Sequence, residues 1–533
     1  MMKILALLLT FTIVHISLMA QSQQSDSIPW HHNSPDDSDW QGISLDRALQ
    51  YVEKKNRIAN IVIVAVIDSG LDTAHEDIRD RLWHNPGEIP YNNIDDDGNG
   101  YIDDIYGWNF IGGSDGRNIE GETLESVRFY RENKKGYAGK SSSEIPKEKK
   151  AEYKLWLKAK KEVLSKIKSY NELIKNYSNW YDAIDDAQNI LSESIGEDSL
   201  SIEDIKMYSP QNKNEKAARN LLIYTDSIGL SKDRAVKVKA HFERELEKKY
   251  NLNYNPRPDI IGDDTDDMND SIYGNNDISA KGLSHGTGVS GIIGAIRNNG
   301  IGTQGIVDSV QIMAIRVVPG GDERDKDVAL AIRYAVNNGA KIINCSFGKD
   351  YSKHPEFVLD AIDYAIAHDV LIIHAAGNSA ENNDKVKHYP TPKESQRTHW
   401  IDVGASGQKD DLNLAADFTN YGRKTVDVFA PGVNIYSISP KNKYHSTSGT
   451  SDSAPVVAGI AAFLKSYYPE LSATQLRQII IESAIVFKKT KVKMPGSSKK
   501  TTKFGKLSTS GGVVNVYTAV LLAEKLLEEK LSQ

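Results

Sequence analysis

Three residue types that can together activate a serine hydroxyl occur in separate glycine-bearing segments of this 533-residue chain. Ser451 lies in SGTSDSAPVVAG, His285 in SHGTGVSGIIGA and Asp68 in IVIVAVIDSG. A serine hydroxyl is a poor nucleophile near neutral pH, so a serine hydrolase needs a histidine to take its proton and a carboxylate to orient that histidine. These residues are therefore candidates for the nucleophile, the general base and the orienting acid of a hydrolase.

A further polar residue, Asn378, could stabilise the charge that such a reaction develops. The tetrahedral intermediate of acyl transfer carries an oxyanion, which must meet hydrogen-bond donors that are already in place. Asn378 ends the segment HAAGN, shortly after the apolar run 370–373. We expect its side chain to donate to the oxyanion together with the backbone N–H of Ser451.

Apolar segments beside these residues predict the elements that hold them. The run 61–67 is rich in β-branched side chains and predicts a buried parallel strand that ends at Asp68. Ligands bind along the carboxyl edge of such sheets, where Asp68 would then lie. A helix that begins just after His285 would hold the imidazole on a rigid element. The stretch Val456–Leu464 predicts a buried helix, and Pro455 is tolerated only in the first turn of that helix.

The rest of this region alternates short apolar runs with an amphipathic helix. The helix is predicted over Asp327–Asn338 and is ended by Gly339. Further strands are predicted at Val310–Val318, from Ile342, and at Val370–Ala375, Ile401–Gly404 and Val426–Phe429. This alternation predicts an α/β fold with a doubly wound, mostly parallel sheet and helices on both faces.

The order of these segments resembles the subtilisin-like serine peptidases, the subtilases of peptidase family S8. The resemblance covers residues 58–111 and 270–518, in the blocks VAVIDSGLD, SHGTGVSGI, INCSFG, HAAGN, DVFAPG and GTSDSAPVVAG. It implies a serine endopeptidase that forms an acyl-enzyme on Ser451, with Asp68 and His285 completing the triad and Asn378 in the oxyanion hole. The implied partner is a peptide or protein substrate, and no organic cofactor is implied.

The same resemblance implies where a substrate lies. Ser346, Phe347 and Gly348 would form an extended edge that pairs with the substrate backbone. Ala376 and Gly377 would line the pocket for the residue before the cut. Pairing of this kind accepts an extended peptide and makes limited demands on its side chains.

Asp452 departs from the family pattern, in which an apolar residue usually follows the nucleophile. A carboxylate at this position could disfavour negative charge on the oxyanion and slow acylation. Alternatively, Asp452 points away from the site and complements the dipole of the helix that it helps to begin, and we favour this interpretation. The alternative function is a catalytically weak or silent subtilase-fold protein that acts as a binding partner through its insertion.

The insertion occupies residues 118–262, between a first part of the catalytic domain at 58–117 and a second part at 263–533. Most of it is rich in Lys, Glu, Tyr and Leu and poor in glycine. Apolar residues at three- and four-residue steps predict a helical subdomain: Tyr153, Leu157, Leu164, Ile167, Ile174, Tyr177, Val238, Phe242 and Leu246. This subdomain is a peripheral decoration, a lid or substrate-selecting arm, or an aid to folding. A selecting arm would make the protein a narrow processing peptidase.

An acidic loop before the insertion predicts a metal site. Its candidate ligands are Asp95, Asp97, Asn99 and Asp103. They place oxygen atoms at mostly alternate positions around Gly100, much as a calcium-binding loop does, although Tyr106 stands where an EF-hand has its bidentate Glu. The alternative is a loop of Asx turns that holds no ion. A second acidic segment, 263–270, is expected to be a solvated loop near the mouth of the cleft.

The N-terminus predicts a secretory signal at residues 1–20, followed by an N-terminal segment at 21–57. A basic start precedes an apolar run and a small residue, Ala20, at a plausible cleavage position. The run is also long enough for an uncleaved membrane anchor, but Thr10 and His15 interrupt it. We therefore expect an extracytoplasmic protein, secreted or periplasmic, without stable membrane association after cleavage.

Composition excludes some further classes. The only cysteine, Cys345, cannot form an intramolecular disulfide and is expected to be a small buried side chain. Stability must then come from the size of the core and from bound metal. A net charge of −7 offers no general case for nucleic-acid binding. No pattern in the sequence indicates an oligomeric state.

Overall fold

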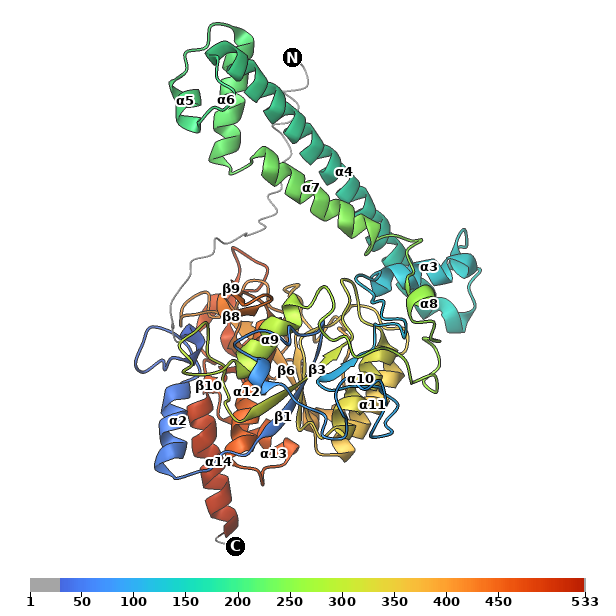
Figure 1. Cartoon of the computed structure of the whole chain (residues 1–533), viewed down its shortest axis with the longest axis vertical. Helices are drawn as coiled ribbons and strands as arrows, with labels where there is room; N and C mark the ends of the chain where they lie inside the picture. Colours follow the sequence, from blue (N-terminus) through green and yellow to red (C-terminus); the bar gives the residue numbers. More distant parts are fainter. Residues whose placement is uncertain (1–28, 532–533) are drawn as a thin grey trace.

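The computed structural model describes residues 29–531, so the predicted signal segment 1–20 lies outside the described residues. Its centre is a nine-stranded sheet in the order β10-β13-β7-β6-β5-β4-β1-β3-β2 (Figure 1). Neighbouring strands pair in parallel except β10 and β13. The strands are β1 Val62–Asp68, β2 Gly107–Asn109, β3 Val310–Arg316, β4 Ile342–Cys345, β5 Leu371–Ala375, β6 Trp400–Ser406, β7 Val428–Pro431, β10 Ile485–Val486 and β13 Gly512–Val513. The predicted doubly wound, mostly parallel α/β sheet is confirmed.

Helices cover both faces of this sheet (Figure 1). One layer contains α2 Leu45–Lys54, α9 Ser284–Gly294, α12 Thr450–Tyr467, α13 Ala473–Glu482 and α14 Val516–Leu531, and the other contains α10 Asp325–Asn337 and α11 Pro355–Ala367. Along β1, Val62, Val64 and Val66 pack against the first layer, whereas Ala65 and Ile67 pack against the second. Because both faces are buried, the strand appears in the sequence as a continuous apolar run.

The remaining elements of the α/β body are short. Two antiparallel hairpins pair β8 Ile435–Ser439 with β9 Lys443–Thr447, and β11 Lys491–Lys493 with β12 Thr501–Lys503. The 3-10 helices of this body are η2 Trp30–His32, η3 Arg79–Arg81, η5 Glu394–His399 and η6 Phe504–Lys506, whereas η4 Lys147–Lys149 precedes α4 Lys150–Ile195 outside it. Among the helices of residues 29–531, none is both long and apolar enough to span a membrane.

Parallel pairing brings the carboxyl ends of three strands to one edge of the sheet. Strand β1 pairs with β4, with Ile67 opposite Cys345, so Asp68 lies beside the segment that follows β4. Strand β4 pairs in turn with β5, which ends at Ala375, three residues before Asn378. The candidate acid and the candidate oxyanion donor therefore lie along the edge where such sheets bind ligands.

An arm of helices projects from the body between β2 and α9 (Figure 1). It consists of α3 Glu125–Tyr137, α4 Lys150–Ile195, α5 Ile202–Met207, α6 Lys213–Ser227, α7 Lys232–Glu247 and α8 Arg257–Ile260. Helix α4 runs over 46 residues and is therefore about 70 Å long. Helix α7 packs along it, and α5 and α6 lie at the tip (Figure 1). At the base, the Arg117 guanidinium donates to the Asp259 carboxylate at 2.6 Å and so joins the chain segments that enter and leave the arm.

Two separate hydrophobic clusters hold the arm together. At the base, α4 packs against α3 through Tyr153, Trp156, Ala159 and Val163. At the tip, it packs against α5 and α6 through Trp180, Ile184, Ala187 and Leu191. Leu157 and Leu164, which belong to the predicted apolar stripe, are each 41% exposed. The stripe was wrong at these two positions because residue spacing does not show which side of α4 its neighbours cover.

Buried ion pairs fasten the base of the arm to the α/β body. The Arg128 guanidinium of α3 donates to the Glu125 carboxylate at 2.5 Å. The Lys349 ammonium, from the segment after β4, lies 3.2 Å from Glu125 and 3.0 Å from Asp325 of α10. Burial alone would raise the pKa of Glu125, but the charges of Arg128 and Lys349 outweigh it and lower that pKa. Removing one partner would leave an uncompensated buried charge.

The acidic segment 263–270 differs from the solvated loop expected from its composition. The Asp263 side chain is 1% exposed, 2.6 Å from Arg257 and 3.0 Å from Lys326. Asp266 is half-exposed and pairs with Lys353 at 2.8 Å. The expectation is wrong for Asp263 because one of its cationic partners lies 63 residues further along the chain, where composition does not show it.

Candidate active site

Asp68 and His285 form a direct pair at the sheet edge. The His285 Nδ1 atom lies 2.8 and 2.9 Å from the two carboxylate oxygens of Asp68. An added Cβ at Gly286 would lie 2.2 Å from the carbonyl oxygen of Gly70, so only glycine lets α9 approach β1 this closely. When Nδ1–H donates to Asp68, Nε2 of the neutral imidazole is left as an acceptor. That is the state of a general base.

Ser451, the second residue of α12, exchanges two hydrogen bonds with Ser346. The Ser451 hydroxyl donates to the Ser346 carbonyl oxygen at 3.1 Å, and the Ser346 hydroxyl donates to the Ser451 carbonyl oxygen at 2.9 Å. Pro455 is the sixth residue of α12, so the expectation that it lies in the first turn is wrong. Proline has no N–H for the Ser451 carbonyl, and the Ser346 hydroxyl takes the place of that donor.

The Asn378 amide is oriented by Thr450. Its oxygen accepts from the Thr450 backbone N–H at 2.8 Å and from the Thr450 hydroxyl at 3.0 Å. The amide nitrogen is therefore the group left to donate. The backbone N–H of Ser451 lies in the first turn of α12, where helices leave their N–H groups without intrahelical acceptors. These are the two donors that an oxyanion requires.

The Ser451 hydroxyl is directed toward Ser346 rather than toward His285. The two helices that carry the pair, α9 and α12, pack against each other. Rotation about the Cα–Cβ bond of Ser451 redirects the hydroxyl without moving α12. Catalytic hydrogen bonds are often long or poorly aligned in proteins without substrate and tighten only when substrate binds.

Asp452 lies within electrostatic reach of His285. Its side chain is buried and accepts from the Thr447 hydroxyl at 2.7 Å. Burial raises the pKa of Asp452 to about 6, although the Thr447 hydrogen bond and the His285 charge act in the opposite direction. The charge of Asp68, joined by that of Asp452, raises the pKa of His285 to about 9 against the effect of desolvation. The interpretation that Asp452 points away and only complements the helix dipole is therefore incomplete, because it leaves out the effect of Asp452 on the pKa of His285.

A cavity of about 380 Å³ opens beside Ser451 and Asn378. All the residues predicted to bind substrate line it: Ser346, Phe347, Gly348, Ala376 and Gly377. It is also lined by residues that no sequence motif indicated, among them Leu124, Ser126, Glu162, Tyr250, Asp350 and His388. The first four belong to the insertion, so the base of the arm is part of the cavity wall.

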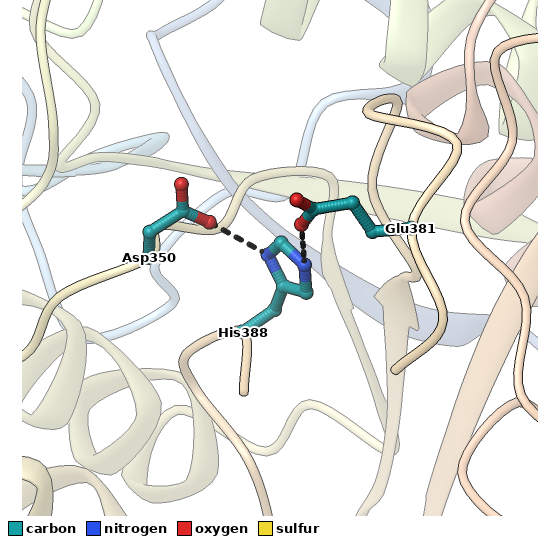
Figure 2. Close-up of side chains that lie close together, drawn as sticks. All are labelled: Asp350, Glu381 and His388. Atoms are coloured by element: carbon teal, nitrogen blue, oxygen red, sulfur yellow. Dashed lines mark hydrogen bonds and ion pairs between the residues drawn. The ribbon is translucent and has the colours of Figure 1, made fainter. Parts of the chain in front are cut away.

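One histidine of this cavity is held between two carboxylates (Figure 2). The His388 Nδ1 atom lies 2.9 Å from Asp350, and its Nε2 atom lies 3.0 Å from Glu381. Burial alone would lower the pKa of His388, but the two carboxylates outweigh it and raise that pKa. Both ring nitrogens can donate only in the imidazolium form. The positive charge of His388 is therefore neutralised by the two carboxylates of this cluster.

The acidic loop forms a carboxylate cluster that differs from the predicted ligand set. Asp95 and Asp97 lie with Glu88, one oxygen of each within 4.8 Å of the others. Asp103 accepts from two backbone N–H groups at 3.3 and 2.8 Å, and the Asn99 side-chain oxygen accepts from one at 2.7 Å. Glu88 and Asp95 of the cluster also accept from backbone N–H groups. Glu88 lies upstream of the motif, where no spacing rule indicates it. Three carboxylates at this separation suit a hard cation with oxygen ligands, such as calcium.

Comparison with known proteins places the chain among proteases. M-protease from Shouchella clausii (strain KSM-K16) is 35% identical over 205 residues, 38% of this chain and 50% of that protein. Subtilisin BL from Lederbergia lenta is 35% identical over 206 residues, 38% of this chain and 71% of that protein. Cell wall-associated protease from Bacillus subtilis (strain 168) is 32% identical over 227 residues, 42% of this chain and 24% of that protein. The chain thus spans about half the length of M-protease and less of the cell-wall protein.

One solved structure and one family model are also similar to this chain. A protease from Pseudoalteromonas arctica PAMC 21717 aligns with a TM-score of 0.37 and 26% identity, over 45% of this chain and 70% of that protein's chain. The model of the subtilase family, Peptidase_S8, matches residues 59–511. Because this match includes well over half of the chain, the protein belongs to the subtilase family of serine-type endopeptidases.

Proposed function

We propose that this subtilase cleaves peptide bonds through an acyl-enzyme on Ser451, with His285 as the general base and Asp68 as its orienting acid. The pairing of His285 Nδ1 with Asp68 at 2.8 Å is the observation that supports this assignment best. The pair lies at the carboxyl edge of the sheet and beside the helix that carries Ser451 in its first turn. The substrate class is peptides or proteins.

The reaction proceeds in two halves. The Ser451 oxygen attacks the scissile carbonyl while His285 Nε2 takes the hydroxyl proton, and Asp68 stabilises the imidazolium that forms. The oxyanion accepts from the Asn378 amide nitrogen and from the Ser451 backbone N–H. His285 then gives the proton to the leaving amine, and a water molecule hydrolyses the ester in the second half. The reciprocal bonds between Ser346 and Ser451 keep the substrate-binding segment in register with the nucleophile.

A fluorophosphonate probe tests whether Ser451 is an activated nucleophile. We expect the folded protein to be labelled, the modified peptide to contain Ser451, and Ser451→Ala to abolish labelling. Ser446→Ala serves as the matched control because Ser446 is exposed on β9. A folded protein that stays unlabelled would instead support a silent subtilase that binds partners through its arm.

The rate of hydrolysis should rise with pH. Asp452 helps to determine the pH at which this rise occurs. Only neutral His285 can accept the proton, and its pKa is raised to about 9, so kcat/KM should increase as pH rises toward that value. Asp452→Asn removes a negative charge near His285, lowers its pKa and moves this rise to lower pH. The measurement is kcat/KM as a function of pH. Asp80→Asn, at a site 71% exposed, is the control, and a rise at unchanged pH in Asp452→Asn would refute the coupling.

Calcium should bind at Glu88, Asp95 and Asp97 and stabilise the fold. These carboxylates would hold the ion, whose role there is structural. At a free calcium concentration of about 100 times Kd, the free energy of unfolding should increase by about 2.7 kcal/mol. Titration calorimetry and thermal unfolding measure both effects. Glu88→Gln should weaken binding by about tenfold or more, whereas Asp103→Asn should change it little because Asp103 lies outside the cluster. A larger effect of Asp103→Asn than of Glu88→Gln would instead support the ligand set predicted from the sequence.

The signal pattern and the arm suggest where the protein acts and how it chooses substrates. We expect an extracytoplasmic protein because of the signal pattern in residues 1–20. The arm is proposed to select substrates, since Glu162 of α4 and Tyr250, which follows α7, line the cavity beside Ser451.

A further inference from the structure

We propose that the cavity beside Ser451 receives the side chain of the residue before the scissile bond and selects lysine or arginine there. This inference rests on the proposed function, because it names the substrate class of the same site. It depends on three features of the cavity: its position, the charges on its wall and one buried nitrogen without a partner.

The position of the cavity connects it to the reacting carbonyl. Ser451, Asn378 and the segments 346–348 and 375–377 all line the cavity. A carbonyl carbon placed at the Ser451 hydroxyl, with its oxygen at Asn378, directs the side chain of the same residue between these two segments. Residues at the base of the arm and His388 also line the cavity, and its volume of about 380 Å³ suits a long side chain.

The charged groups on the wall are mostly acidic. Glu162, Asp322 and Asp350 line the cavity. Burial disfavours the charged form of Asp322 and raises its pKa; Glu162 and Asp350 are the other carboxylates of the wall. Lys349 also lines the cavity, but its ammonium lies 3.2 Å from Glu125 and 3.0 Å from Asp325, and these carboxylates neutralise it.

Other cations near the wall do not reverse this balance. His388 is one positive charge between the two negative charges of Asp350 and Glu381 (Figure 2). Lys158 of α4 lies over the ring of Tyr351 and within the field of Asp350, but it is exposed, and water screens its charge. An acidic substrate side chain would therefore meet no free cation among the described residues of the wall.

A buried nitrogen on the wall requires a donor. His374 is 3% exposed and lines the cavity, and its Nδ1 atom lies 2.7 Å from Asp402. Among the described residues its Nε2 atom has no hydrogen-bond partner. An added Cβ at Gly348, another residue of the wall, would lie 3.6 Å from that nitrogen, so Nε2 lies beside this segment of the wall. With Nδ1–H donated to Asp402, Nε2 of the neutral ring accepts.

These groups match a cationic, donor-rich side chain. A guanidinium offers five N–H donors and an ammonium three, and neither has an acceptor. Either offers donors to the carboxylates and to the His374 nitrogen, whereas an apolar side chain would leave the buried nitrogen without a partner. A carboxylate would face Glu162 and Asp350 as like charges.

A peptide series that varies only the residue before the cut tests the selection. We expect kcat/KM for arginine and lysine to exceed that for citrulline, the uncharged analogue of arginine, by about tenfold or more, with glutamate the poorest. Equal values for arginine and citrulline, or a maximum at leucine, would overturn the proposal.

Two variants locate the selecting charge. Asp350→Asn and Glu162→Gln should each lower the ratio of kcat/KM for arginine over citrulline by about threefold or more. Asp80→Asn, which is exposed and outside the cavity, should leave the ratio as it is. Both side chains are partly exposed, so these changes preserve the fold. A ratio unchanged in both variants would overturn the assignment.

Binding to the Ser451→Ala protein separates this inference from the proposed reaction. We expect n-butylguanidinium to bind this variant and n-butylurea to bind at least about tenfold more weakly, measured by calorimetry. Binding of this kind would stand even if the wild-type protein failed to react with a fluorophosphonate. Equal affinity for the two compounds, in a protein that does react, would refute the selection and leave the proposed reaction intact.

Discussion

Replacing both His285 and Ser451 with alanine should reduce kcat for peptide hydrolysis no further than either single replacement, by about 10⁶-fold, the loss typical of subtilisin triads. The hydroxyl is useless without a base to take its proton, and the base has no role without the hydroxyl. Residual hydrolysis should come from binding and from the oxyanion donors, which both variants retain.

The measurement is the kcat of the two single variants and of the double variant on one peptide. A folded state equal to that of the wild type, seen by circular dichroism, is the control. Losses that multiply in the double variant would show that His285 and Ser451 act independently and would contradict the proposed triad.

Asn378→Asp should lower kcat by about 10² to 10³, the range typical of oxyanion donors in subtilisins, with little change in KM. Aspartate can still accept the two Thr450 hydrogen bonds that orient Asn378, so the local structure should persist. It replaces the amide donor with an oxygen that repels the developing negative charge. Stability, measured by thermal unfolding, should change much less than activity.

Asn413→Asp is the matched control for this change. Asn413 is exposed and lies outside the cavity, and its side chain accepts from Lys493 at 2.8 Å, so the same substitution there should leave kcat unaffected. Full activity of Asn378→Asp would exclude Asn378 as an oxyanion donor.

The parallel sheet was predictable from sequence because each strand is a short apolar run buried on both faces. Runs such as 61–67 have that pattern, and the polar residue at the end of a run indicates the carboxyl edge. The motifs therefore named Asp68, His285, Asn378 and Ser451 before their contacts were known. The roles of these residues in the reaction stay predictions.

The part of the cavity wall that the arm contributes could not be predicted from sequence. Glu162 is one charged residue on a long helix of charged residues, and nothing in its spacing shows that it lies beside a serine 289 positions later. Periodicity indicates that a side chain is buried or exposed, but it does not indicate the partner. Glu88 was missed for the same reason, since it joins Asp95 and Asp97 from outside their motif.

Pro455 shows another limit of local rules. The rule that proline belongs in the first turn considers only the helix, so it predicts a later start for α12. The helix begins earlier because the hydroxyl of Ser346, from a different strand connection, supplies the missing donor to Ser451. A tertiary contact thus replaces a local one.

The closed base of the arm also bears on how the chain folds. Asn109 and Asn275 are 166 positions apart, yet their side chains lie 2.9 Å from each other. Helices α4 and α7 contact each other at shorter sequence separations, such as the 72 positions between Tyr170 and Phe242, than the 248 positions between the paired Val62 and Val310. Contacts of shorter separation form faster. Once the two helices have packed, the chain between β1 and β3 behaves as a shorter loop when these strands pair. Even as a flexible loop, each doubling of its length would cost only about 0.6 kcal/mol. The catalytic fold can therefore carry an arm of this size with little entropic penalty.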